Sequence, residues 1–227
     1  MNPRTLTQPQ LAKMIDHSLL HPQITDQDVD EGCALARRYN VASVCVKPCH
    51  VVLAKSLLVG SDLAVGVVIG FPHGGATMAS KVFEAREAIE CGATELDMVI
   101  NIGKLRSGAV DYVQEEIWQI VSAAQDCLVK VILENAYLDH DQKVAVCQAA
   151  EAAGADFVKT STGYAPTGST VEDIQLMRAT VTSKVQIKAA GGIRTLEAFY
   201  AAVDAGATRV GATATAAILD AFSVKGL

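Results

Sequence analysis

Short hydrophobic runs alternate with amphipathic segments along the whole chain. The runs are rich in Val, Ile and Leu, as is typical of parallel strands that are buried on both faces. In the segments between them, hydrophobic residues recur at helical spacing, and in the clearest one they are Val113, Ile117, Ile120, Val121 and Ala124. The pattern therefore predicts strands and helices in strict succession.

We expect eight strands, each followed by a helix. The predicted strands are 15–17, 41–46, 63–69, 94–100, 128–133, 156–159, 185–189 and 208–210. After a short leading helix that ends at 11–14, the helices are predicted at 25–39, from Pro48 onward, and at 78–91, 110–124, 139–153, 171–180, 195–205 and 212–222.

Such an alternation implies parallel strands joined by right-handed crossovers. A closed (β/α)8 barrel and a doubly wound open sheet both fit it. The count of eight strands and the absence of a G-x-G-x-x-G motif after the first strand favour the barrel. Because no linker divides the chain, we expect residues 1–227 to form one α/β domain, a closed (β/α)8 TIM barrel with a short N-terminal helix.

The composition narrows the classes of partner. The 227 residues are 50% hydrophobic and 19% charged, which excludes a disordered chain. A net charge of −6 argues against a general nucleic-acid surface, so backbone donors and a few lysines would have to hold any anionic substrate. The first ten residues are polar, and no hydrophobic run is long enough to cross a bilayer. We expect a cytoplasmic protein with no nucleic-acid or membrane partner.

The cysteines and histidines show no metal-binding pattern. Reduced thiols without a C-x-x-C pair are expected at Cys33, Cys45, Cys49, Cys91, Cys127 and Cys147. Loop or core positions are expected for His17, His21, His50, His73 and His140. We therefore expect no metal and no cofactor, and a metal-dependent reaction is the least favoured alternative.

Two lysines and one aspartate stand out within apolar strands. Lys159 ends the predicted strand six, Lys188 lies at the same height in strand seven, and Asp97 lies in strand four. In barrels of this kind the carboxyl ends of the strands carry the active site. A charge buried there is costly unless it is paired, and a desolvated lysine is a candidate Schiff-base nucleophile.

The charges of these residues suggest how the nucleophile is made. Two ammonium groups about 6 Å apart, at an effective dielectric near 20, repel by roughly 2.8 kcal/mol, which lowers a lysine pKa by about two units. Lys188 would thus keep Lys159 neutral, while Asp97 keeps Lys188 charged. Two alternatives stay open: Asp97 and one lysine form only a structural ion pair, or Lys159 extends its amine to water.

Glycines follow three neighbouring strands. Gly163 follows strand six, Gly191 and Gly192 follow strand seven, and Gly211 follows strand eight, just before the helix expected to start at 212–213. In barrels, loops at these positions often bind phosphate through backbone N–H groups and a helix N-terminus. The spacing predicts a sugar-phosphate site.

Several of these segments are family motifs. They are LDMVINIG at 96–103, VKTSTG at 158–163, IKAAGGIR at 187–194, IDHSLL at 15–20 and VCV at 44–46. On these motifs the chain resembles the 2-deoxyribose-5-phosphate aldolase family over essentially its whole length. The resemblance implies a metal-independent (β/α)8 lyase of deoxyribonucleotide catabolism and carbohydrate degradation. Such an enzyme joins acetaldehyde and glyceraldehyde 3-phosphate reversibly through a Schiff base.

The resemblance also implies roles for single residues. Lys159 corresponds to the Schiff-base lysine, Lys188 to the second lysine that perturbs it, and Asp97 to the acid of the proton relay. Positions that the family places around the substrate are matched by Asp16, Cys45, Lys130 and Thr162. The phosphate-binding loops are matched by Gly163, Gly191, Gly192 and Gly211, and Thr213 keeps a hydroxyl there.

The chain departs from the family pattern at three places. Ala214 replaces the second of two serines that commonly help to hold phosphate, and Asn135 stands where a threonine is more usual. The sequence ends in VKGL at 224–227, without the C-terminal tyrosine that serves proton transfer in some members. The resemblance then leaves proton transfer to Asp97, Lys188 and water.

Two other functions remain open on the sequence alone. One is a lysine aldolase for keto acids, with Arg194 as the nearest carboxylate ligand, and the other is a non-catalytic barrel that binds sugar phosphates. We expect the partners to be small-molecule aldehydes and sugar phosphates. A homodimer or another homo-oligomer is the expected assembly.

Overall fold

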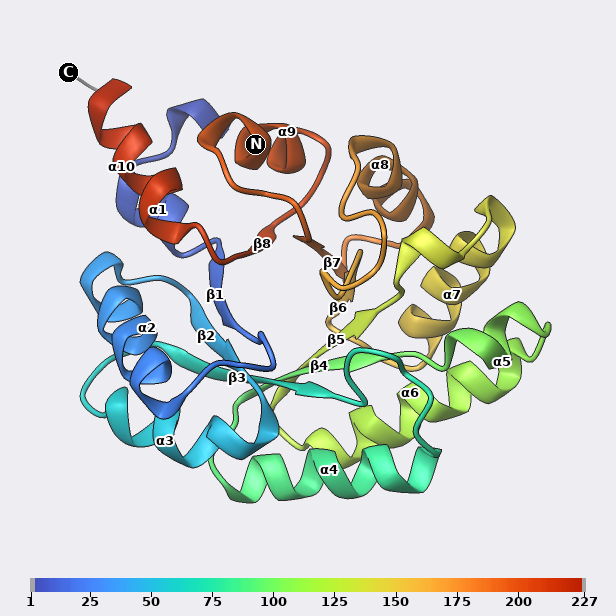
Figure 1. The fold of residues 1–227 in the computed structure, drawn as a ribbon. Helices are drawn as coiled ribbons and strands as arrows, with labels where there is room; N and C mark the ends of the chain where they lie inside the picture. Colours follow the sequence, from blue (N-terminus) through green and yellow to red (C-terminus); the bar gives the residue numbers. More distant parts are fainter. Residues whose placement is uncertain (1–2, 226–227) are drawn as a thin grey trace.

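Eight parallel strands close into a barrel in the computed structural model, which describes residues 3–225 (Figure 1). Each strand pairs with the next one, and β8 pairs with β1. The strands are β1 Ile15–Leu19, β2 Ser43–Val46, β3 Ala64–Ile69, β4 Glu95–Val99, β5 Leu128–Ile132, β6 Phe157–Lys159, β7 Gln186–Ala190 and β8 Arg209–Ala212. The predicted closed (β/α)8 barrel is confirmed.

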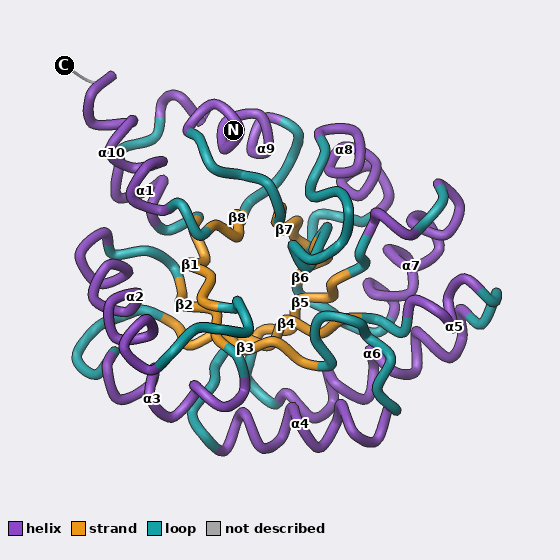
Figure 2. Tube along the Cα trace, in the orientation of Figure 1, coloured by secondary structure: helices purple, strands orange, loops and turns teal. Residues whose placement is uncertain are grey.

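The helices form a ring around the strands (Figure 2). The α-helices are α1 Gln8–Ala12, α2 Asp26–Tyr39, α3 Val51–Leu57, α4 Met78–Glu90, α5 Ile102–Arg106, α6 Val110–Ala124, α7 His140–Ala152, α8 Val171–Thr180, α9 Leu196–Asp204 and α10 Thr215–Lys225. Short 3-10 helices lie at Pro3–Thr5, Pro48–His50 and Asn135–Tyr137. Residues 226 and 227 lie outside the described residues. They are the end of the segment 224–227, whose sequence contains no tyrosine.

Some element boundaries differ from the sequence prediction. The leading helix α1 ends at Ala12, and the helix expected from Pro48 is divided into a 3-10 turn and α3. The short helix α5 is an element that the hydrophobic pattern does not indicate. Asn101 begins this helix by accepting a hydrogen bond from the Lys104 N–H (3.1 Å). A polar cap, rather than an amphipathic repeat, is the sequence feature that accounts for it.

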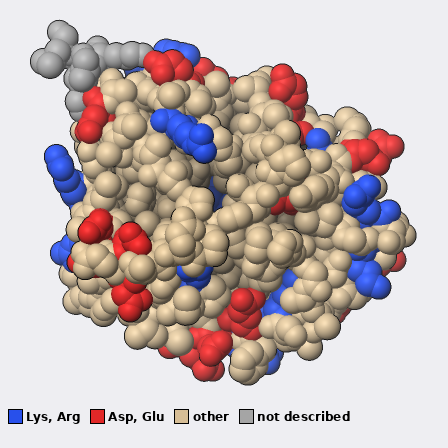
Figure 3. Space-filling view, viewed as in Figure 1, with Lys and Arg blue, Asp and Glu red and all other residues tan. Residues whose placement is uncertain are grey.

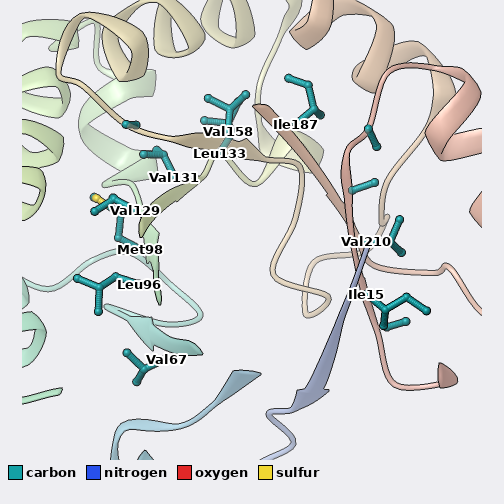
Figure 4. Close-up of a cluster of buried hydrophobic side chains, with 14 of the residues drawn as sticks. Ile15, Val67, Leu96, Met98, Val129, Val131, Leu133, Val158, Ile187 and Val210 are labelled. Carbon is teal, nitrogen blue, oxygen red and sulfur yellow. The ribbon is translucent and has the colours of Figure 1, made fainter. Parts of the chain in front are cut away.

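Side chains along each strand alternate between the barrel interior and the helices. The outward-facing set is hydrophobic (Figure 4) and includes Val67, Leu96, Met98 and Val131, each 0% exposed. Burying such a side chain stabilises the fold by about 1.5–3 kcal/mol. In β4 the residue between Leu96 and Met98 is Asp97, which therefore faces the interior.

Acidic and basic side chains are interspersed on the face of the molecule drawn in Figure 3. A broad basic surface is the usual mark of nucleic-acid binding. Among residues 3–225, no helix combines the length and the hydrophobicity that crossing a bilayer requires.

A buried ion pair outside the barrel holds the carboxyl end of β4. Lys81 of α4 donates to the Val99 carbonyl (2.7 Å) and to Glu116 of α6 (2.8 Å), and Glu116 accepts from the Asn101 N–H (2.9 Å). Both charged side chains are 0% exposed. Burial lowers the pKa of Lys81 and raises the pKa of Glu116, while each charge partly stabilises the other. Loss of one partner would leave the other charge buried and alone.

We predict that Lys81→Met lowers the free energy of unfolding by about 3–5 kcal/mol, because the Glu116 carboxylate then lacks its counter-ion. The exposed substitution Lys184→Met is the control and should change this free energy by no more than about 0.5 kcal/mol. Urea unfolding at neutral pH, followed by circular dichroism, measures both. Equal effects of the two substitutions would contradict a structural role for the Lys81–Glu116 pair.

Candidate active site

Lys159 and Lys188 lie side by side inside the barrel. Their Cα positions are paired between β6 and β7, and the residues are 3% and 1% exposed. Both amines contact the same oxygen of Asp97 in β4, because Oδ2 accepts from Lys159 Nζ (2.6 Å) and from Lys188 Nζ (2.7 Å). The structure therefore brings together the three residues for which the sequence predicts catalytic roles.

The Asp97 carboxylate is shared by three lysines. It is 0% exposed, and its second oxygen, Oδ1, accepts from Lys130 Nζ of β5 (2.9 Å). Burial opposes ionisation, but the three ammonium groups outweigh it and hold the pKa of Asp97 well below its usual range. Asp97 is thus a carboxylate at neutral pH. The sequence predicts its contact with Lys188, and the structure adds the contacts with Lys159 and Lys130.

The pKa values of Lys159 and Lys188 are shifted in opposite directions. Burial lowers the pKa of Lys159, and the Lys188 charge adds to this effect although Asp97 opposes it. Burial would lower the pKa of Lys188 as well, but its contacts with Asp16 and Asp97 outweigh burial and raise that pKa. Lys159 is therefore the amine that gives up its proton more readily, and Lys188 stays charged.

Asp16 and Lys130, which the resemblance places around the substrate, have protein partners. Asp16 is 0% exposed and contacts Lys188 Nζ (2.6 Å) and Arg209 Nη1 (2.6 Å). Lys130 is 1% exposed and donates to Glu95 (2.6 Å). Neither side chain lines the cavity next to Lys159 that is described below. Direct contact of Asp16 or Lys130 with a substrate stays a prediction.

Glu95 and Arg209 are charged residues of the interior that the sequence predictions do not include. Arg209 of β8 contacts Glu95 (3.4 Å), and its guanidinium lies over the Phe157 ring (5.6 Å). Alternation in β4 places Glu95 on the same face as Asp97 and could have identified it. Arg209 carries no such signal, because its strand is too short to show an alternating pattern.

These two residues complete a set that we call the interior charge network. Its members are Asp16, Glu95, Asp97, Lys130, Lys159, Lys188 and Arg209. The carboxylates of the network are occupied by lysine and arginine side chains. Among residues 3–225, no group of three or more His, Cys, Asp or Glu side chains is arranged to hold a metal ion.

Cys45 belongs to a small hydrophobic cluster. It packs with Leu20 and Val68, and Phe71 packs against the same cluster. Burial raises the pKa of the Cys45 thiol to about 11, so the thiol is protonated at neutral pH. The charges of Asp97 and of the lysines Lys188, Lys159 and Lys130 act on this thiol. Cys45 is thus a neutral, weakly polar residue in the field of these charges.

Thr162 is held by Glu134, a residue to which the sequence gives no role. The Thr162 N–H (3.2 Å) and the Thr162 hydroxyl both donate to the Glu134 carboxylate. Glu134 is 2% exposed and has a positive φ of 56°. Burial raises the pKa of Glu134, and the hydrogen bonds from Thr162 oppose this. The orientation of the Thr162 side chain is therefore fixed by the protein.

A cavity of about 140 Å³ lies next to Lys159. Its lining includes Lys159, Thr162 and all five residues predicted to bind phosphate, Gly163, Gly191, Gly192, Gly211 and Thr213. Gly191 and Gly192 have φ angles of 88° and 84°, a conformation that residues with a side chain rarely adopt. The cavity thus joins an amine and a glycine-rich backbone surface in one space, which suits a small molecule with an anionic group.

The loop between β8 and α10 differs from the sequence prediction. Ala212 still pairs with His17 of β1, so α10 begins at Thr215 and not at 212, and Thr213 lies in the loop. Thr215 Oγ1 is hydrogen-bonded to His17 Nδ1 (2.9 Å). Burial lowers the pKa of His17 to about 4, so this ring is neutral. The Ala214 carbonyl accepts a helical hydrogen bond from α10 (3.1 Å), which makes Ala214 the cap of that helix.

The chain has close relatives among known proteins. The sequence model of the DeoC/LacD family aldolase matches residues 10–224. A deoxyribose-phosphate aldolase of Thermoanaerobacter sp. (strain X514) is 50% identical over 216 residues, covering 94% of this chain and 97% of that protein. Deoxyribose-phosphate aldolase 1 of Staphylococcus aureus (strain MRSA252) is 51% identical over 207 residues, covering 91% of this chain and 94% of that protein.

Solved structures share the fold. A protein from Coccidioides immitis has a TM-score of 0.93 at 39% identity, covering 96% of this chain and 87% of that one. A deoxyribose phosphate aldolase from Aeropyrum pernix, described as having a unique tetrameric structure, has a TM-score of 0.86 at 33% identity, covering 95% of this chain and 92% of that one. The resemblance inferred from the motifs is confirmed, and the chain belongs to the DeoC/LacD family of aldolases.

Proposed function

We propose that this protein catalyses the reversible cleavage of 2-deoxy-D-ribose 5-phosphate to D-glyceraldehyde 3-phosphate and acetaldehyde. The chain belongs to an aldolase family, and the relatives named above are deoxyribose-phosphate aldolases. The observation that carries most weight is that the amines of Lys159 and Lys188 share Asp97 Oδ2 beside a glycine-lined cavity. In this reaction the protein acts as a carbon–carbon lyase.

The proposed reaction begins with the neutral amine of Lys159. This amine attacks the aldehyde carbon of the open-chain sugar, and loss of water leaves an iminium ion. A free lysine has a pKa near 10.4, so roughly one molecule in 2,500 is neutral at pH 7. Burial and the neighbouring Lys188 charge lower the pKa of Lys159 and thereby raise this fraction.

The iminium then serves as the electron sink. The bond between C2 and C3 breaks as the C3 hydroxyl loses its proton, glyceraldehyde 3-phosphate leaves, and an enamine remains on Lys159. Protonation of the enamine at C2 and hydrolysis of the resulting iminium release acetaldehyde and restore the amine. We assign donation of a proton to the Lys188 ammonium and acceptance of one to the Asp97 carboxylate, with a water between them and the substrate; the contacts of Asp97 with Lys188 and with Lys159 support this assignment.

The remaining residues hold the substrate or the charges. The phosphate is assigned to the backbone N–H groups of Gly163, Gly191, Gly192 and Gly211 and to the Thr213 hydroxyl, all of which border the cavity. Thr162, oriented by Glu134, is assigned to a substrate hydroxyl. Because the lysine is both nucleophile and electron sink, the route calls for no metal or cofactor.

A second candidate is a lysine aldolase that acts on keto acids. One observation favours it, since Arg194 lines the same cavity and a guanidinium is a strong ligand for carboxylate. The two candidates differ in their donor substrate. Labelling by pyruvate and not by acetaldehyde would support the second one.

We predict that acetaldehyde with sodium cyanoborohydride leaves an ethyl group on Lys159, and that Lys159→Arg abolishes both this label and cleavage activity. Peptide mass spectrometry locates the label. A labelled lysine elsewhere, or a folded protein without any label, would overturn the proposed mechanism. Lys184→Met, which replaces an exposed lysine, is the control, and it should carry the same label on Lys159 as the unaltered chain.

We predict a change in the pH profile when the second lysine is lost. The rate of labelling depends on neutral Lys159, so it rises with pH through the lowered pKa of that residue. Lys188→Met removes a neighbouring positive charge, which raises the pKa of Lys159 and moves the midpoint of the profile to higher pH. Labelling at pH 7 should fall about tenfold for each pH unit by which the midpoint rises. An unchanged midpoint in a folded variant would contradict the role given to Lys188.

We predict that Ala214→Ser improves use of the phosphorylated sugar. A hydroxyl at this position can donate to a phosphate oxygen, and one such bond to a charged group contributes about 1.5 kcal/mol, or roughly tenfold in affinity. The KM for 2-deoxyribose 5-phosphate should therefore fall about tenfold while the KM for 2-deoxyribose does not change. Because a serine also caps a helix well, thermal stability must be measured beside the kinetics. A stabilised variant with an unchanged ratio of KM values would contradict this role.

We also propose that residues 1–227 form one domain and that the chain assembles into a cytoplasmic homo-oligomer. The family match extends over 10–224 in one piece, and the Aeropyrum pernix relative is described as tetrameric. Light scattering coupled to size exclusion should give a multiple of the 23.9 kDa chain mass. A mass of 23.9 kDa at micromolar concentration would contradict an oligomer.

A further inference from the structure

Glu95 and Arg209 contribute opposite charges to the interior charge network. Glu95 of β4 accepts from Lys130 Nζ (2.6 Å), and Arg209 of β8 contacts Asp16 (2.6 Å). Arg209 also contacts Glu95 (3.4 Å). Among the described residues, the ion pairs of Glu95 and Arg209 do not include the amine of Lys159. Their effect on that amine is therefore electrostatic and not a direct contact.

Two routes connect these residues to Lys159. In one, Arg209 contacts Asp16, Asp16 contacts Lys188, and Lys188 contacts the Asp97 oxygen that Lys159 also contacts. In the other, Glu95 contacts Lys130 and Lys130 contacts the second Asp97 oxygen. Both routes end at the same carboxylate.

The interior charge network has more basic than acidic groups. Within residues 3–225, its four basic members are Lys130, Lys159, Lys188 and Arg209, and its three acidic members are Asp16, Glu95 and Asp97. With every group ionised, the network would hold one uncompensated positive charge in the barrel. An uncompensated buried charge is costly, so the network favours the loss of one proton.

Lys159 is the member that can lose a proton at least cost. Lys188 contacts both Asp16 and Asp97, and Lys130 contacts Glu95 and Asp97. Lys159 contacts Asp97 alone among these carboxylates and shares it with the two other lysines. It therefore has the smallest share of negative charge in the network.

Two further titratable groups interact with Lys159 electrostatically and lie outside the network. The Cys45 thiol of β2 is held protonated by burial, which raises its pKa to about 11. Glu134 follows β5, and within residues 3–225 the hydrogen bonds of its carboxylate are to Thr162 and not to the network. Burial raises the pKa of Glu134, while the hydrogen bonds from Thr162 and the Lys159 charge oppose this. The contribution of Glu134 is common to all the variants compared below, so it does not affect the signs of the expected changes.

We propose that Glu95 and Arg209 are positioning residues that set the protonation of Lys159 with opposite signs, Arg209 by adding the surplus positive charge and Glu95 by limiting it. The inference rests on the proposed function in taking Lys159 as the nucleophile. It goes further by assigning the neutral state of Lys159 to the balance of the whole network, and not to Lys188 alone.

The signs follow from Coulomb interactions. Arg209→Met removes one positive charge and leaves three basic and three acidic groups, so Lys159 keeps its proton more firmly. Glu95→Gln removes one negative charge and leaves two surplus positive charges, so Lys159 loses its proton more easily. At an effective dielectric near 20, one unit charge in such a network changes a pKa by about one pH unit.

The experiment measures the rate at which acetaldehyde and cyanoborohydride label Lys159, as a function of pH, in the full chain. We expect the midpoint of the profile to move up by about one pH unit in Arg209→Met and down by about one pH unit in Glu95→Gln. Arg209→Lys keeps the charge and should leave the midpoint near that of the unaltered chain. The double variant Glu95→Gln/Arg209→Met should also return the midpoint toward that value.

A purely structural role predicts a different result. Loss of packing or of an ion pair would lower stability and labelling in both single variants without moving their midpoints in opposite directions, and that result would overturn the inference. Circular dichroism and thermal unfolding establish that each variant is folded. Gln has the shape of Glu, so the direction in which the midpoint moves in Glu95→Gln decides the matter even if Arg209→Met does not fold.

Failure of the inference and failure of the proposed function give different results. If the unaltered chain carries no label on Lys159, the proposed function itself is wrong. If the unaltered chain is labelled on Lys159 but the two single variants keep its midpoint, only the role given to Glu95 and Arg209 is wrong.

Discussion

The aldolase chemistry proposed for this protein depends on one buried carboxylate that three lysines share. Asp97 accepts hydrogen bonds from Lys130, Lys159 and Lys188, which extend from three consecutive strands. One negative charge cannot balance three positive ones where water is excluded, and the lysine with the fewest other partners is the one that becomes neutral most readily. The proposed nucleophilic amine thus follows from how the interior charges are distributed, and not from Lys159 alone.

The barrel makes this distribution possible because it sorts side chains by strand face. Outward positions such as Leu96 and Met98 are hydrophobic and pack under the helices (Figure 4). Asp97, between them in β4, faces the interior. Closure of the sheet then brings residues from β1, β4 and β8 within contact distance of one another. The same geometry places the glycine-rich loops after β6 and β7 around one cavity beside Lys159, together with Thr213. Gly211 also lines this cavity, but it lies within β8 and not after it as the sequence predicted, because it still pairs with Asp16 of β1.

The departures from the family pattern have different structural consequences. Ala214 caps α10 and directly follows Thr213, which lines the cavity next to Lys159, so Ala214 is adjacent to that lining without being part of it. Asn135 is buried, with its N–H donating to the Thr160 carbonyl (3.0 Å) and its side-chain amide directed at Met177 of α8 (3.3 Å). It does not line the cavity next to Lys159, so this departure concerns packing under α8 and not contact with the substrate.

The sequence by itself determined the order of strands and helices, the closed barrel, and the two lysines on neighbouring strands, because hydrophobic periodicity and strand order are local properties. It also identified the glycine loops and, through shared motifs, the aldolase family. Only the tertiary structure decided that Asp16 and Lys130 contact protein charges, that Arg209 and Glu134 belong to the site, and that α10 begins at Thr215. These features depend on contacts across a closed barrel and on the β1–β8 register, which join residues that no local pattern relates.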